Sequence, residues 1–96
     1  MTCSCEHDTH RPPATQAEAL ALARHCTAIA GQLETVAKAD DKWMSVMRCN
    51  RCGALWAEDS MSSGHATMFF IYPITTDDPI GWLAAAVPLD PPAKRT

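Results

Sequence analysis

The hydrophobic positions of this chain first follow a helical period. From residue 15 to about residue 38, apolar side chains recur at steps of three and four, which places them on one face of an α-helix. This stripe consists of Leu22, Cys26, Ile29, Leu33 and Val36. Thr15 and Glu18 have the spacing of a capping box, and the alanines of the run favour a helix. The pattern predicts one long helix from Thr15 to about Lys38.

The later part of the chain changes to strand-like patterns. Residues 43–48 and 53–58 predict two strands that flank a turn, and residues 59–64 predict a loop. Residues 65–74 form the most β-prone stretch, in which Pro73 favours an edge strand or a strand end. Asp78 followed by Pro79 is typical of an N-cap and a first helical position, and predicts a short helix over residues 80–86. Three of its residues should face inward: Trp82, Leu83 and Ala86.

Length and composition indicate one small globular domain over residues 1–96, because 47% of the residues are hydrophobic and 20% are charged. Within it, residues 1–13 read as an N-terminal arm and residues 88–96 as an extended tail. No apolar run has the length of a membrane span, and residues 1–10 lack the apolar region of a signal peptide. We therefore expect a cytoplasmic protein. The net charge of -3 and the pI near 5.7 argue against binding to a phosphate backbone.

The cysteines carry the strongest chemical signal. Cys49 and Cys52 are two residues apart and precede Gly53, which suits the left-handed turn of a zinc knuckle. Cys3 and Cys5 form a second pair near the N-terminus. In a reducing compartment such pairs are thiols or metal ligands rather than disulfides. We expect these four thiolates to hold one structural zinc ion, because a site with four protein ligands leaves no position for a reactive water.

Other arrangements of these ligands remain open. His7 or His10 can replace Cys3 or Cys5, and four thiolates can also hold an iron–sulfur cluster, although the small chain favours zinc. The remaining alternative is that the N-terminal cysteines are unliganded thiols in a disordered segment. Cys26 lies within the apolar stripe, so we expect it in the core rather than at the metal.

Residues 43–58, which carry the Cys49-x-x-Cys52-Gly53 turn between two strands, resemble part of a zinc ribbon. The Cys3-x-Cys5 spacing departs from the repeated CxxC of that family. The predicted fold class is α+β. A three-stranded antiparallel sheet with a zinc knuckle packs against one long N-terminal helix and a short C-terminal helix.

Nothing in the sequence forms a catalytic set. There is no nucleophile motif or phosphate-binding loop, and His25 and Cys26 point about 100° apart on a helix. We therefore expect a non-enzymatic interaction protein. In size, charge and zinc-ribbon-like core, the chain resembles the bacterial immunity proteins that neutralise toxins.

That resemblance implies a protein partner, such as a basic toxin, held by complementary charge. The expected contacts are three acidic pairs: Asp40 and Asp41, Glu58 and Asp59, and Asp77 and Asp78. An exposed tryptophan, Trp43 or Trp56, would add to them, although at least one of the two should pack in the core. The alternative is a zinc-ribbon module that binds nucleic acid or assists transcription, with Arg48 and Arg51 beside the knuckle. The acidic balance of the chain makes nucleic acid the less favoured partner.

Overall fold

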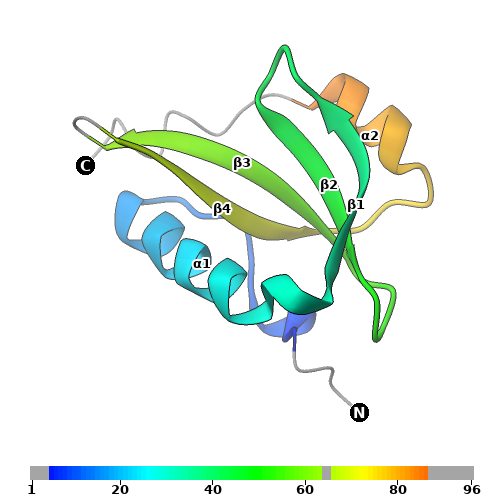
Figure 1. Cartoon of the computed structure of the whole chain (residues 1–96), viewed down its shortest axis with the longest axis horizontal. Coiled ribbons are helices and arrows are strands. Elements are labelled where there is room, and N and C mark those ends of the chain that lie inside the picture. The colour runs from blue at the N-terminus through cyan, green and yellow to red at the C-terminus, as the bar shows by residue number, and fades with distance from the viewer. Residues whose placement is uncertain (1–4, 64–65, 87–96) are drawn as a thin grey trace.

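The described part of the chain folds as two α-helices and one antiparallel sheet of four strands. The computed structural model describes residues 5–63 and 66–86, so the predicted tail of residues 88–96 lies outside the described residues. The elements are η1 (His7–Thr9), α1 (Gln16–Ile29), η2 (Ala30–Gln32), β1 (Leu33–Ala39), β2 (Met44–Cys49), β3 (Leu55–Ser63), β4 (Ala66–Ile74) and α2 (Pro79–Ala85). The strand order is β1-β2-β3-β4. Helix α1 lies along β4, whereas α2 packs beside β1 and β2 (Figure 1). The predicted α+β class is confirmed, but the sheet has one strand more than expected.

The extra strand comes from the end of the predicted long helix. Helix α1 begins as expected, because the Thr15 hydroxyl accepts a hydrogen bond from the Glu18 backbone N–H at 3.2 Å. It ends at Ile29, and the prediction that it continues to Lys38 is wrong. Residues 33–39 instead pair with β2, with a shift of register between Thr35 and Ala37. Ladder hydrogen bonds with β2 and packing against α2 therefore outweigh the helical period of this stretch.

Strands β3 and β4 form a hairpin in which β3 extends beyond the predicted strand of residues 53–58. The ladder runs from the pair Leu55 and Ile74 to the pair Ser63 and Ala66, so most of the loop expected at residues 59–64 belongs to β3. The backbone of residues 59–63 pairs with the backbone of β4, and this pairing outweighs the loop-like composition of the stretch. Pro73 lies in β4, which is an edge strand as its proline predicted.

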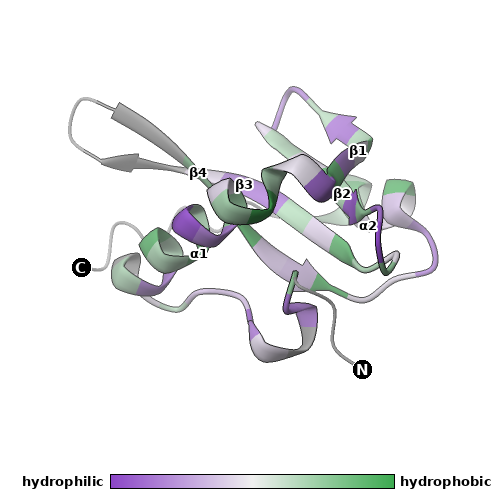
Figure 2. Ribbon diagram, turned by 60° about the horizontal axis from the view of Figure 1, so that its bottom comes forward, coloured by the Kyte–Doolittle hydropathy of each residue, from purple (hydrophilic) through white to green (hydrophobic). Residues whose placement is uncertain are grey.

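Two apolar clusters form the core. One contains residues from α1, the strands and α2: Ala19, Leu22, Met44, Val46, Ala57, Phe70, Tyr72, Ile74 and Leu83. The other lies next to the N-terminal arm: Cys5, Ile29, Met47, Cys49, Trp56 and Ile71. Because neighbouring strand residues alternate between the two clusters, apolar contacts cover both faces of the sheet. Figure 2 shows hydrophobic positions along the sheet and helices, whereas the β1–β2 turn is hydrophilic.

Helix α2 is held at both ends. The Asp78 carboxylate accepts a hydrogen bond from the Gly81 N–H at 3.1 Å, which confirms the predicted N-cap. At the other end, the Lys42 ammonium donates to the carbonyls of Leu83, Ala84 and Ala86 at 2.8, 2.8 and 2.9 Å. A cation beside these carbonyls complements the negative end of the helix. The β1–β2 turn is thereby fixed to α2.

Within the described part of the chain, neither helix combines the length and the apolar character that crossing a lipid bilayer requires.

Candidate metal centre and surface hollow

The knuckle is a tight turn between β2 and β3. Its backbone closes through bonds from Cys49 N–H to the Ala54 carbonyl and from Gly53 N–H to the Cys49 carbonyl, both at 2.8 Å. Gly53 has a φ of +79°, the left-handed conformation expected for it. The Asn50 N–H donates to the Gln32 carbonyl at 2.7 Å, so η2 supports the turn from outside. Cys49 is fully buried at the end of β2, and Cys52 is exposed at the tip.

The N-terminal arm brings Cys5 to this turn. His25 of α1 donates from Nε2 to the Cys5 carbonyl at 2.6 Å, and the Cys5 side chain is fully buried. His7 Nε2 lies 2.8 Å from the Leu55 carbonyl and 3.1 Å from that of Ile74, to which it donates. The arm is therefore attached to α1 and to the ends of β3 and β4 by its own side chains and backbone, and the cysteine is not its only anchor.

The three thiols are arranged as metal ligands. The sulfur atoms of Cys5, Cys49 and Cys52 all lie within 4.8 Å of one another, and those of Cys5 and Cys52 are 3.5 Å apart. This separation is far longer than the roughly 2.04 Å of a disulfide bond. It is close to the roughly 3.8 Å between two thiolates that share a tetrahedral zinc. The structure thus brings together three of the four predicted ligands in one possible metal site.

The fourth predicted ligand, Cys3, lies outside the described residues. Of the histidine alternatives, His7 directs Nε2 to two backbone carbonyls, as described above. His10 groups with Glu6 and His25 instead of with the thiols. Cys26 is half-buried beside the second core cluster, as expected for a core residue. Burial, and after it the charge of Glu58, raise the pKa of the Cys26 thiol, which keeps this thiol protonated at neutral pH.

A second group of possible ligands, which the sequence pattern did not indicate, combines two residues of the arm with one of α1. Donor atoms of Glu6, His10 and His25 come within 4.8 Å of one another. The His10 and His25 rings have centroids 4.3 Å apart, and both contact the Trp56 indole. Burial, then the charge of His25, lower the pKa of His10 against an opposing effect of Glu6, so this imidazole is neutral at pH 7. No short motif joins these residues, since His25 comes from α1.

The acidic residues expected at a partner surface do not form one patch. Asp59 is only 1% exposed and accepts a hydrogen bond from the Ser60 N–H, so it does not lie on the surface. Asp77 and Asp78 are exposed at the start of α2, where Asp78 caps the helix. Asp40 and Asp41 are exposed in the β1–β2 turn. Asp40 forms an ion pair with Lys38 at 3.5 Å.

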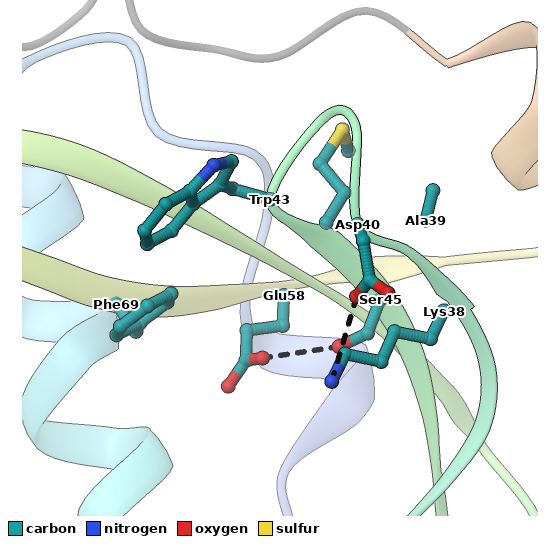
Figure 3. Close-up of a pocket in the computed structure, with 8 residues that line it drawn as sticks. Lys38, Ala39, Asp40, Trp43, Ser45, Glu58 and Phe69 are labelled. Atoms are coloured by element: carbon teal, nitrogen blue, oxygen red, sulfur yellow. Dashed lines mark hydrogen bonds and ion pairs between the residues drawn. The ribbon is translucent and has the colours of Figure 1, made fainter.

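Asp40 and Glu58 meet at a cavity of about 410 Å³, which we call the β1–β2 hollow (Figure 3). Six residues define its chemistry: Lys38, Asp40, Trp43, Ser45, Glu58 and Phe69. Figure 3 shows Trp43 and Phe69 on one side of this hollow, the Lys38–Asp40 pair on the other, and Glu58 with Ser45 between them. The Ser45 hydroxyl donates to one Glu58 oxygen at 3.0 Å and so fixes the carboxylate.

Trp43, in the β1–β2 turn, and Trp56, in β3, have opposite environments. Trp56 is fully buried, which confirms core packing for one of them. Trp43 is 64% exposed and has a φ of 56°, a left-handed conformation that costs a bulky residue about 1–2 kcal/mol. Phe69, across the hollow, is 43% exposed. Phe69 was not among the predicted contact residues. The signal for it is the adjacent aromatic pair Phe69 and Phe70, because alternation along a strand turns one of two neighbours outward.

Comparison with known proteins identifies no relative: no family model, curated protein or solved structure matches this chain.

Proposed function

We propose that this protein is a non-catalytic, zinc-stapled interaction protein that binds a basic protein partner through the β1–β2 hollow. The exposed, left-handed Trp43 is the observation that carries the proposal. A strained backbone that holds a large apolar side chain in solvent works against stability, and such strain concentrates at functional sites. The Lys42 bonds to α2 hold the turn from which Trp43 projects.

The chemistry of the hollow favours a cationic side chain of the partner. Aromatic faces attract cations, and an arginine guanidinium can stack on an indole while it binds a carboxylate. Glu58 supplies a carboxylate fixed by Ser45. Lys38 and Asp40 offset each other's charge, so the hollow keeps one net negative charge from Glu58. A partner with an exposed arginine or lysine fits this arrangement, and a basic toxin neutralised by an immunity protein is one partner of that kind.

In this role, the metal ion would be structural. We propose that Cys3 completes the set of Cys5, Cys49 and Cys52 around one zinc ion, which ties the arm to the knuckle. The nucleic-acid alternative is less favoured. Arg48, one of the two arginines beside the knuckle, forms an ion pair with Glu34, with Nε 3.1 Å from the carboxylate.

The test is a binding measurement with matched surface variants. A partner captured from the host is purified, and its affinity is measured for the wild type and for Trp43→Ala, Glu58→Gln and Ile80→Ala. Ile80 is the control, because it is 70% exposed but lies away from the hollow. Trp43→Ala should weaken binding about 30-fold, as expected for loss of a central aromatic contact worth about 2 kcal/mol. Ile80→Ala should change affinity less than about threefold.

The salt dependence of association, the affinities of the variants and the type of partner captured can each contradict the proposal. Association with a basic partner should slow as salt increases, because steering is screened over about 8 Å at physiological ionic strength. Equal affinities of the Trp43 and Ile80 variants would exclude the hollow as the contact surface. Capture of nucleic acid without protein would favour the zinc-ribbon alternative instead.

A further inference from the structure

We infer that Glu6, His10 and His25 form a second metal site that takes a divalent transition metal of the zinc type, separate from the thiolate site. The three residues supply two imidazole nitrogens and one carboxylate oxygen within 4.8 Å of one another. Donors around a tetrahedral zinc are roughly 3.3 Å apart, so a single ion requires rotation of the Glu6 and His10 side chains toward His25, which keeps its orientation. This inference does not depend on the proposed function.

His25 is oriented as metal-binding histidines usually are. Its Nε2 donates to the Cys5 carbonyl at 2.6 Å, which assigns the ring proton to Nε2. In the neutral ring, the other nitrogen, Nδ1, then carries the lone pair that a metal needs. A backbone carbonyl on the far nitrogen is a common support for a ligating imidazole, because it fixes both the tautomer and the ring orientation.

His10 supplies the second, independent observation. Its Nε2 is buried and has no hydrogen-bond partner among the residues that the structure describes. A buried polar atom of this kind costs free energy unless a water or an ion satisfies it. The neighbouring His25 ring, 4.3 Å away, can share an ion with it.

Glu6 completes the group from the solvent side. It is exposed, and its backbone has a left-handed conformation with a φ of 56°. Trp56 closes the opposite side through contacts with both imidazoles, at centroid distances of 6.0 and 5.5 Å. An ion held here has three protein ligands and one position open to water. Mixed nitrogen and oxygen donors suit zinc, cobalt or nickel rather than calcium or magnesium.

The test uses the full-length, reduced protein. Metal is removed with a chelator, one equivalent of zinc is added to fill the thiolate site, and cobalt(II) is then titrated. We expect a second equivalent to bind with visible cobalt absorption but without thiolate-to-cobalt charge transfer. The imidazole proton signals of His10 and His25 should broaden at the same time, because cobalt is paramagnetic.

Variants separate this site from the first. Glu6→Gln and His10→Phe should each weaken the second equivalent at least about 10-fold, since even loss of an outer partner of a ligand has an effect of that size. Both should keep the first equivalent. Asp41→Asn is the matched control, because it removes an exposed carboxylate in the distant β1–β2 turn.

Three results would overturn the inference. They are a wild type in which all cobalt bound by the metal-free protein shows thiolate charge transfer, a second equivalent that Glu6→Gln and His10→Phe leave unchanged, and a second equivalent with thiolate charge transfer. Glu6→Gln alters an exposed side chain, so it keeps the test decisive even if His10→Phe does not fold.

Discussion

Replacement of Lys42 by methionine tests how the β1–β2 turn and α2 support each other. The Lys42 ammonium donates to three carbonyls at the end of α2, at 2.8 to 2.9 Å. Hydrogen bonds to a charged group contribute about 1.5–3 kcal/mol each when buried, and a cation at a helix C-terminus contributes up to about 2 kcal/mol. Because Lys42 is only half-buried, we expect Lys42→Met to lower the free energy of unfolding by about 2 kcal/mol in all.

The assay is urea unfolding combined with a thermal melt. A loss of about 2 kcal/mol corresponds to a fall in Tm of roughly 10 °C for a domain of this size. Lys38→Met is the matched control, since the Lys38 side chain is 71% exposed and its ion pair with Asp40 lies at the surface. It should change stability by less than about 0.5 kcal/mol. Equal effects of the two variants would refute the role of Lys42 as a cap. In Lys42→Met, the amides of α2 should also exchange hydrogen faster than in the control.

The remaining predictions concern the cysteines and the arm. Cys52→Ser should abolish tight zinc binding and destabilise the fold strongly, as elemental analysis and a melt with and without zinc will show. Cys26→Ala should keep the zinc and lose about 1 kcal/mol of packing; release of the metal would mean that the ligand set is wrong. Deletion of residues 1–6 should also remove the zinc, and an unchanged zinc content would place the missing ligands in the body of the domain. Because its pKa is raised, Cys26 should react with iodoacetamide more slowly at pH 7.5 than a model thiol, and an equal rate would contradict its burial.

The sequence alone determined the features that depend on near neighbours. The Thr15 and Asp78 caps, the left-handed Gly53 and the edge position of Pro73 follow from the bonding and backbone freedom of single residues. The CxxC turn between two strands belongs to the same class. Each of these signals involves residues within a few positions of one another, so the local structure that it favours does not depend on the rest of the fold.

Tertiary structure decided the features that depend on distant partners. Residues 33–39 have a helical period, yet they form β1 because β2 and α2 offer ladder bonds and apolar contacts there. Trp43 and Trp56 look alike in sequence, and only the sheet register and the turn place one in solvent and the other in the core. Likewise, Glu6 and His25 are nineteen positions apart and meet only because the arm folds back onto α1. Such contacts form only when distant segments pair and the chain reverses direction. A local sequence pattern does not determine the free energy of these steps.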